Sequence, residues 1–276
     1  MRFNTGKFLI VALSVLAISC SKYNQLLKSD KVSQKFAKGL EYYEKGKYRR
    51  AQLLIASVAE DYAGKIGEDS VFYYLGTTFY KEGDFLTSGD IFEQYRQTFI
   101  STPFDEEVEY MWAKGFYFMS PPYYRDQSTT LQALSAIAEY LSHYPNSVKR
   151  EDLEDNTREL TLKLYDKSFE NAHLYYKIGY YNSAIIALRN ALDEYPGTNH
   201  REDIYYYIVC SHYEYARKSQ LHLQRIRYMN LQDAYLSFIS EYPDSEFRKD
   251  ADKMNNEAIK YLEKYNTTSA YGNQEE

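Results

Sequence analysis

A phrase built around glycine recurs along the chain and constrains the fold more than any other feature. The segments "YYEKGKYRRA", "FYKEGDFLTS" and "YYKIGYYNSA" each contain two adjacent aromatic residues ending three positions before a glycine, an aromatic two positions after it and a small residue three further on. Glycine adopts the left-handed conformation that ends a helix and turns the chain. The phrase therefore predicts antiparallel helix pairs that turn at Gly46, Gly83 and Gly179, with Tyr48, Phe85 and Tyr181 packed into the pairs they join.

A second phrase marks where each pair ends. The segments "SHYPNS", "DEYPGT" and "SEYPDS" surround Pro145, Pro196 and Pro243, which are 51 and 47 residues apart. Proline cannot continue a helix, so each phrase predicts a helix end, and the unequal spacing indicates a repeat with insertions. An alanine stands nine residues before each proline, where a second helix can approach closely, at Ala136, Ala187 and Ala234.

These signals predict an all-α fold. With only 12 Gly and 6 Pro, the chain can form few tight turns between strands. We expect five helix pairs, over residues 33–64, 69–101, 106–145, 155–196 and 202–243. A capping helix follows over residues 246–265, because its apolar residues keep helical spacing.

The units resemble the tetratricopeptide repeat, whose pattern places small and aromatic residues at fixed positions. The second unit matches at Leu75, Gly76, Phe79, Ser88 and Phe92, and the first at Gly39, Tyr42, Ala51 and Ile55. The fourth matches at Ala172, Tyr175, Ala184, Leu188 and Pro196. The third unit carries an insertion, "SPPYYRD", at its turn, and the fifth matches least well. The resemblance implies a superhelix of stacked helix pairs over residues 33–265.

The amino terminus has the composition of an export signal. Arg2 and Lys7 precede the apolar run "FLIVALSVLAIS", which is too short for a membrane span and ends at Cys20. The pattern resembles a bacterial lipobox, although Ala17 stands where leucine is usual. We expect residues 1–19 to be a signal peptide and Cys20 to carry a diacylglycerol and an acyl chain such as palmitate. A plain signal peptide is the alternative. Residues 20–32 are predicted to form a lipidated tether and residues 266–276 a disordered tail.

No catalytic signature is found in the sequence. It lacks nucleophile-elbow, zinc-protease and phosphate-loop motifs, and none of the five histidines is three or four residues from another. Cys210 has no disulfide partner if Cys20 is lipidated, so we expect a buried, inert thiol. We predict no enzyme activity, no metal site and no cofactor apart from the covalent lipid. The net charge of −6 argues against nucleic-acid binding, and "RKSQLHLQRIR" is a solvated face or, alternatively, meets an acidic partner.

The many aromatic residues, including 32 Tyr, are expected mostly to fill interfaces between helices. Some must face the inner surface of the repeats. Alignment with the repeat pattern predicts an aromatic groove for an extended peptide, formed by Phe36, Leu40, Tyr43, Tyr73, Thr77 and Tyr80.

The chain as a whole resembles the BamD family, the lipoproteins of the outer-membrane β-barrel assembly machine. The resemblance runs from Cys20 to about Tyr265 and includes "YMWAKGFYFMSPPYYRDQ", with Arg125, Asp126 and Gln127, followed by Tyr144 to Ser147. It implies a scaffold at the periplasmic face of the outer membrane. The scaffold would bind a barrel-forming assembly protein with periplasmic repeat domains, and its amino-terminal repeats would receive unfolded β-barrel precursors. The sequence departs from the family pattern in being rich in tyrosine and in having a long fifth unit, "ARKSQLHLQRIRYMNLQDA".

Two alternatives from other classes remain. One is a glycan-binding lipoprotein for nutrient uptake, against which the single Trp112 argues, because such proteins stack sugars on several tryptophans. The other is a repeat scaffold that organises cell-wall enzymes.

Overall fold

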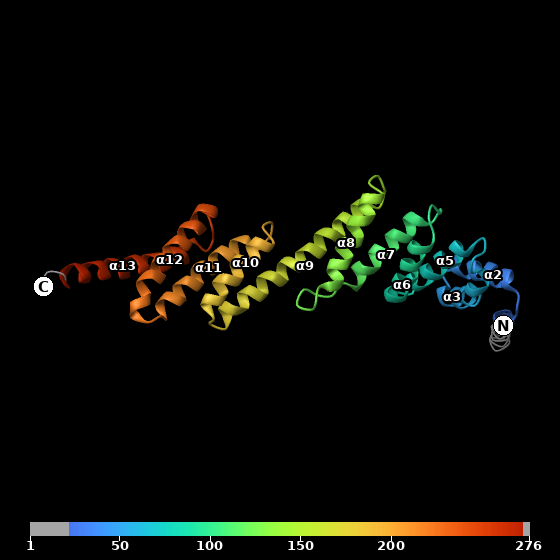
Figure 1. Ribbon diagram of the computed structural model, residues 1–276, viewed down its shortest axis with the longest axis horizontal. Coiled ribbons are helices and arrows are strands. Elements are labelled where there is room, and N and C mark those ends of the chain that lie inside the picture. Colours follow the sequence, from blue (N-terminus) through green and yellow to red (C-terminus); the bar gives the residue numbers. More distant parts are fainter. Residues whose placement is uncertain (1–21, 273–276) are drawn as a thin grey trace, which may run out of the picture. The chain divides into compact units, whose positions relative to one another are not determined.

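The computed structural model describes the backbone of residues 22–272 and the side chains of residues 22–264, and its regular structure within that range is entirely helical. A short helical segment over residues 22–27 comes first. The following helices are α2 (Val32–Glu44), α3 (Tyr48–Ala56), α4 (Ala59–Tyr62), α5 (Glu68–Lys81), α6 (Phe85–Thr98), α7 (Asp105–Met119), α8 (Ser128–His143), α9 (Arg150–Lys177), α10 (Tyr181–Glu194), α11 (Arg201–Arg217), α12 (Leu221–Glu241) and α13 (Arg248–Gly272) (Figure 1).

The helices form the five predicted antiparallel pairs, α2 with α3, α5 with α6, α7 with α8, α9 with α10 and α11 with α12, followed by α13 (Figure 1). The predicted all-α, tetratricopeptide-like fold is confirmed. Two helix ends differ from the predictions. Helix α9 begins at Arg150, ahead of residue 155. Helix α13 continues to Gly272, so residues 266–272 are helical and the predicted disordered tail over residues 266–276 is corrected there.

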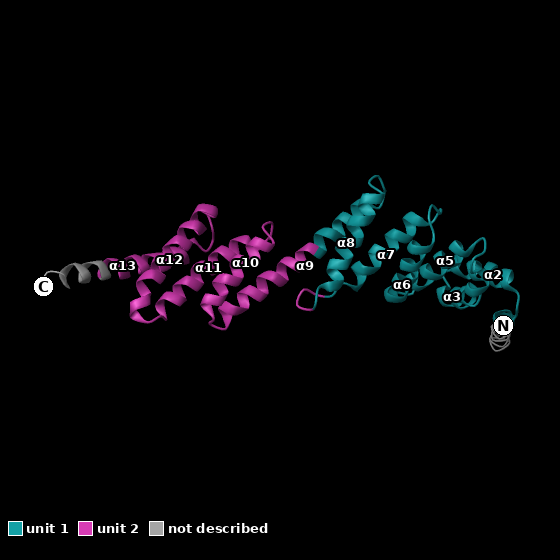
Figure 2. Ribbon diagram, in the orientation of Figure 1, with its two compact units in different colours: residues 1–121, 126–160 teal, residues 122–125, 161–276 magenta. Residues whose placement is uncertain are grey.

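The chain divides into two compact units (Figure 2). Unit 1 contains residues 1–121 and 126–160, and unit 2 contains residues 122–125 and 161–276. Helices α2 to α8 belong to unit 1 and α10 to α13 to unit 2, while α9 contributes residues to both. No helix among residues 22–272 is long and apolar enough to cross a membrane.

The glycine turns within pairs have the geometry that the repeated phrase predicts. Gly46, Gly83 and Gly179 have φ values of 67°, 81° and 84°. In the first turn the Lys47 N–H donates to the Tyr42 carbonyl at 2.8 Å, which satisfies a carbonyl at the end of α2. The other two turns repeat this bond. The aromatic rings on either side of each glycine pack together, with centroids 5.6 Å apart for Tyr43 and Tyr48, 5.3 Å for Tyr80 and Phe85, and 5.8 Å for Tyr176 and Tyr181.

The Tyr-Pro turns between pairs also share one structure, which we call the seam turn. It spans Tyr144–Arg150, Tyr195–Arg201 and Tyr242–Arg248. In each, a Ser or Thr hydroxyl accepts the N–H two residues on, at 3.1, 3.2 and 3.1 Å. The closing arginine then donates to the proline carbonyl, at 3.2, 3.3 and 3.1 Å. The recurring Tyr-Pro phrases of the sequence include the proline and the hydroxyl residue of this turn but end before the arginine.

Each pair closes around small buried residues. Ala51, Ser88, Ala133, Ala184 and Ala234 are all buried in the second helices. In the first two pairs a glycine of the first helix allows the close approach. A Cβ added to Gly39 would lie 2.7 Å from Ile55 Cγ1, and one added to Gly76 would lie 2.5 Å from Phe92 Cε1. Ala136 is buried as well, while Ala187 is partly buried against the core of unit 2.

The amino-terminal segment corrects the predicted tether over residues 20–32. Tyr23 is 9 % exposed and joins the core of the first pair, with Leu26 and Leu27 packed beside it. Its hydroxyl donates to the Arg50 carbonyl at 3.1 Å, and its ring meets the Tyr42 ring edge-on at 5.6 Å. The folded part therefore begins no later than Tyr23, because apolar residues at helical spacing bury themselves against α2 and α3. Residues 1–21, including the expected signal peptide and Cys20, lie outside the described residues.

The close approach at Gly76 gives a direct test of the pair geometry. We expect Gly76→Ala to lower the free energy of unfolding by about 2 kcal/mol, because the fully buried Phe92 ring cannot move aside without strain. The matched control is Gly89→Ala in α6, where an added Cβ meets nothing within 4 Å. That change should be neutral or stabilise by up to about 1 kcal/mol, because alanine is the better helix former. Urea denaturation measures both, and similar effects for the two would contradict the packing.

Candidate functional site

The candidate site is on the groove face of unit 1. We define this face as the surface formed by the first helices of successive pairs, α2, α5 and α7, together with the start of α9 up to residue 160. Helix α5 contacts both α2 and α7, so the face is continuous across the three pairs.

The structure brings three of the predicted groove residues together around Tyr74. The Phe36 and Tyr43 rings both meet the Tyr74 ring, at centroid distances of 6.5 and 5.2 Å. Tyr73 contacts Tyr74 at 5.0 Å and stacks on Phe104 at 4.2 Å. All three are partly exposed, so their rings can both pack together and meet a bound chain.

The other three predicted residues lie differently. Tyr80 belongs to a second aromatic cluster, with Phe85 at 5.3 Å and Phe118 at 6.3 Å. Leu40 is half-buried on α2. Thr77 is only 1 % exposed, and its hydroxyl donates to the Tyr73 carbonyl at 2.6 Å. The prediction for Thr77 is therefore corrected: it supports α5 from within and does not offer a surface contact.

Two carboxylates act on the tyrosines of this face. Burial raises the pKa of the Tyr43, Tyr73 and Tyr80 hydroxyls above the ordinary value, and the negative charge of Glu107 adds to the effect on each. Asp152 contributes in the same direction to the pKa of Tyr80. A tyrosine hydroxyl is protonated at neutral pH in any case, and the raised pKa keeps these three as hydrogen-bond donors into the alkaline range.

A buried lysine, which the sequence did not reveal as a site residue, organises the carboxylate side of the face. Lys114 of α7 donates to Asp152 at 2.6 and 2.7 Å and to Asn156 Oδ1 at 2.6 Å. The Tyr110 hydroxyl donates to the same Asp152 carboxylate at 3.0 Å. Nearby, Lys149 pairs with Glu107 and lies 4.5 Å from the Tyr110 ring centroid. The only hint of this network in the sequence is that Lys114 is a single cation within the apolar stretch "YMWAKGFYFM".

The groove face therefore combines three kinds of group. Partly exposed rings can stack on an apolar or aromatic side chain, and neutral tyrosine hydroxyls can donate to a carbonyl. The Asp152 and Glu107 carboxylates keep 47 % and 41 % of their side chains exposed and can accept N–H groups. An extended peptide carries matching groups along one strand: side chains for the rings, carbonyls for the hydroxyls and N–H groups for the carboxylates.

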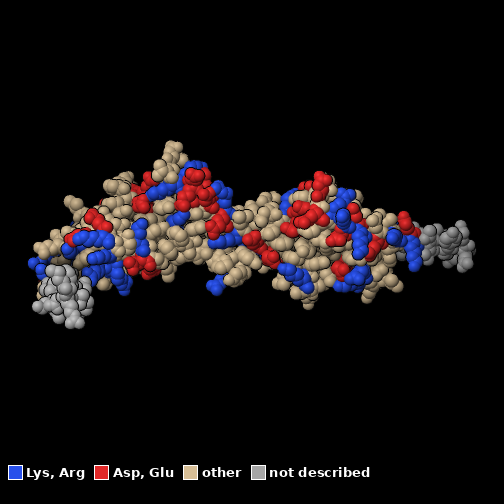
Figure 3. All heavy atoms as spheres, turned by 180° about the vertical axis from the view of Figure 1, so that it is seen from behind, with Lys and Arg blue, Asp and Glu red and all other residues tan. Residues whose placement is uncertain are grey.

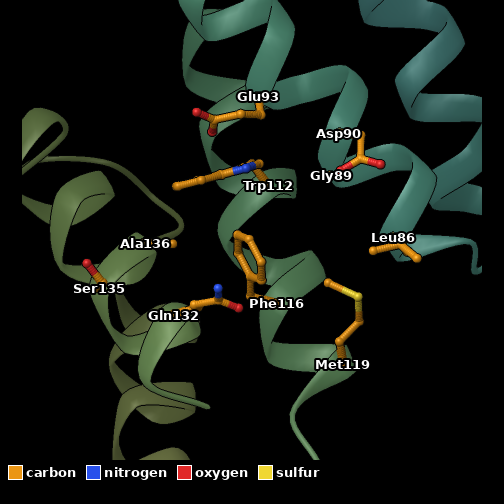
Figure 4. A pocket seen from close by; sticks show the side chains of 10 residues that line it. All are labelled: Leu86, Gly89, Asp90, Glu93, Trp112, Phe116, Met119, Gln132, Ser135 and Ala136. Atoms are coloured by element: carbon orange, nitrogen blue, oxygen red, sulfur yellow. The ribbon is translucent and has the colours of Figure 1, made fainter. Parts of the chain in front are cut away.

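A concavity of about 350 Å³ lies between α6, α7 and α8 in unit 1. Trp112, Phe116 and Met119 line it from α7, while Asp90 and Glu93 lie on α6 and Gln132 on α8 (Figure 4). The Arg96 guanidinium covers the Trp112 ring at 3.9 Å and pairs with Glu93 and Glu139. The tryptophan is thus held in place by the protein's own cation.

The groups considered for metal or thiol chemistry lie elsewhere. Cys210 is buried in unit 2, and burial raises the pKa of its thiol to about 12, which keeps it protonated and unreactive. Burial also lowers the pKa of the neighbouring His212 to about 4. No group of three or more His, Cys, Asp or Glu side chains is placed to hold a metal ion in the described part of the chain.

Comparison with known families places the chain. The family model YfiO, described as an outer membrane lipoprotein, matches residues 28–222. The chain belongs to this family. The YfiO family is the BamD-type outer-membrane lipoprotein family, so the resemblance drawn from the sequence is confirmed. The match includes the whole groove face and ends at the start of α12. None of the curated proteins matches the chain.

The lysine network of this YfiO-family member can be tested by a double-mutant cycle. We expect Lys114→Met and Asp152→Asn to show a coupling energy of about 1 kcal/mol in urea denaturation, because Lys114 is 11 % exposed while Asp152 stays half in water. The control cycle uses Lys38 and Glu41, which are 39 % and 42 % exposed. It should give about 0.3 kcal/mol. Equal coupling energies in the two cycles would show that Lys114 and Asp152 interact no more strongly than an exposed ion pair.

Proposed function

We propose that this protein is a lipid-anchored scaffold that helps to fold and insert β-barrel proteins into the outer membrane. In this role it binds unfolded barrel precursors and the barrel-forming assembly protein. The observation that carries the proposal is the family match over residues 28–222, which includes an aromatic, hydrogen-bonding groove face.

The chemistry of the groove face suits the precursor's terminal strand. Such a strand bears aromatic side chains and has backbone N–H and C=O groups that are not yet paired in a sheet. Tyr43, Tyr73 and Tyr80 supply rings and hydroxyl donors, and Asp152 supplies an acceptor. These contacts use features that all barrel precursors share, so the groove face can bind terminal strands of different sequences.

The anchor and the second partner complete the proposal. Cys20 carries the lipid that holds the scaffold at the periplasmic face of the outer membrane. Several acyl chains on one residue give stable attachment, since each buried CH₂ contributes about 0.8 kcal/mol. The carboxy-terminal pairs dock on the assembly protein's periplasmic repeat domains, which leaves the groove face available to precursors.

Carbohydrate capture is the second candidate, and the cavity at Trp112 is the observation that favours it. An aromatic ring beside Asp90 and Gln132 is a common arrangement for sugars (Figure 4). Arg96 covers the tryptophan ring, however, and Glu93 is occupied by Arg96 and Gln97. The exposed stacking surface is therefore small, and the barrel-assembly role has the stronger support.

We expect Tyr73→Ala with Tyr80→Ala to weaken crosslinking to a precursor's terminal strand at least fivefold, because two stacking surfaces are lost. The helical circular dichroism signal should be unchanged. Tyr73→Phe with Tyr80→Phe separates the rings from the hydroxyls and should have a smaller effect. The control is Tyr175→Ala with Tyr180→Ala, which removes two exposed tyrosines of unit 2. Crosslinking that survives the first pair of substitutions would exclude these residues from the site.

The partner is tested by pull-down from detergent-solubilised membranes. We expect co-purification of a barrel protein that bears periplasmic repeat domains, and depletion should lower the levels of outer-membrane barrels. Recovery of glycan transporters or cell-wall enzymes alone would replace the proposed role with one of its alternatives.

A further inference from the structure

The turn between α2 and α3 carries an unusual concentration of positive charge. Lys45, Lys47 and Arg49 are exposed there, and Arg50 is partly exposed. Figure 3 shows basic side chains gathered at the amino-terminal end of unit 1. The two acids at the end of α2, Glu41 and Glu44, are outnumbered by these cations, and Glu41 is shared between Lys38 and Lys45.

The turn itself does not need these cations. The equivalent glycine turns have the same left-handed backbone at Gly83 and Gly179. Where the first turn has Lys45, Lys47 and Arg49, the second has Glu82, Asp84 and Leu86, and the third has Ile178, Tyr180 and Asn182. Positive charge is thus a property of the first turn and not of the repeat.

Two of the cations, Lys47 and Arg49, lie at the start of a helix, where positive charge is disfavoured. Lys47 occupies the position before α3, makes no capping hydrogen bond and is followed by a first turn without acids. At the same position before α6, Asp84 accepts the Thr87 N–H at 3.1 Å. Helix amino termini favour acceptors and negative charge. Helix α10 also begins without a side-chain cap, after Tyr180, so the positive charge and not the missing cap sets the start of α3 apart.

This basic surface lies close to the lipid attachment point of the proposed function. Tyr23 is fixed to the first turn of α3 by its hydrogen bond to the Arg50 carbonyl, and the Arg50 guanidinium lies 5.4 Å from the Tyr23 ring centroid. Only Ser21 and Lys22 separate Tyr23 from Cys20. Successive Cα atoms are 3.8 Å apart, so the Cα of Cys20 lies within about 11 Å of that of Tyr23. A bilayer that holds the lipid is therefore tied by a short length of chain to Tyr23 and, through Tyr23, to the start of α3.

We propose that the α2–α3 turn, with Lys45, Lys47 and Arg49, binds anionic phospholipid headgroups and orients unit 1 on the membrane. The proposal rests on the anchoring of Cys20 in the proposed function. A lipid chain and a basic surface together form the two-part attachment that keeps peripheral proteins on bilayers. The turn edge of unit 1 then faces the headgroups.

The test is co-sedimentation with vesicles, using the full chain with Cys20→Ser so that acyl chains do not contribute. Any binding through residues 1–19 is the same in every variant. We expect binding to phosphatidylglycerol–phosphatidylcholine vesicles to exceed binding to phosphatidylcholine alone and to fall as salt is raised. Lys45→Gln with Lys47→Gln and Arg49→Gln should weaken binding to the anionic vesicles at least tenfold, since each charge at such a surface contributes roughly fivefold.

The control removes the same charge from unit 2, with Lys249→Gln, Lys253→Gln and Lys260→Gln on α13, where all three lysines are exposed. It should retain wild-type binding. If the two triple variants lost the same amount of vesicle binding, net charge alone would explain the binding, and the proposal would be overturned. Unchanged vesicle binding by the α2–α3 variant would also overturn the proposal. If that variant lost binding to an acidic protein and kept its binding to vesicles, the basic turn would be a protein-binding surface instead.

A single substitution separates this role from a structural one. Lys47→Asp supplies α3 with the cap that Asp84 gives α6, so the urea midpoint should rise while binding to anionic vesicles falls. A fall in both, or a rise in stability with unchanged vesicle binding, would contradict the proposal. Mass analysis of the native amino-terminal peptide tests lipidation separately. An unmodified Cys20 would refute the anchor of the proposed function even if the turn binds vesicles.

Discussion

The close approach of the two helices in each pair is the constraint on which the rest of this structure depends. Gly39 against Ile55 and Gly76 against Phe92 let a side chain of the second helix pack directly on the backbone of the first. A pair packed this closely has flat sides that can stack, and the hydrophobic clusters show the result. The cluster around Leu54 and Ile55 reaches into α5, and the one around Phe92 and Tyr95 reaches into α7. Stability in such a protein comes from neighbour-to-neighbour interfaces and does not need a single central core.

Tyrosine is common here because it serves both sides of these interfaces. Its ring fills the space between first helices, while its hydroxyl reaches a carboxylate on the next one. Tyr110 bonds to Asp152, Tyr117 to Glu159 and Tyr213 to Glu257. Phenylalanine would fill the same space but would leave each carboxylate without this donor. Burial and the adjacent acids raise the pKa of these three tyrosines, so their hydroxyls remain donors throughout the physiological pH range and above it.

The sequence predicted what local backbone chemistry determines. Glycine and proline mark the turns because their φ angles are special, and the five pairs follow from them. Side-chain register placed Phe36, Tyr43 and Tyr73 on one face, and their rings all contact Tyr74. It could not foresee that Thr77 is buried, because that depends on packing between pairs. The network of Lys114 and Asp152 joins residues on two helices and leaves no local pattern. The amino-terminal segment was misjudged because Lys22, Asn24 and Gln25 are polar, although Tyr23, Leu26 and Leu27 already had helical spacing.

The seam turn has a consequence for how such a chain can change over time. Each seam is completed by its own hydroxyl and its own arginine, which bonds to the proline carbonyl of the same turn. A pair bounded by two seams therefore carries everything needed to close both of its ends. Duplicating or deleting one such pair would leave every remaining turn chemically complete.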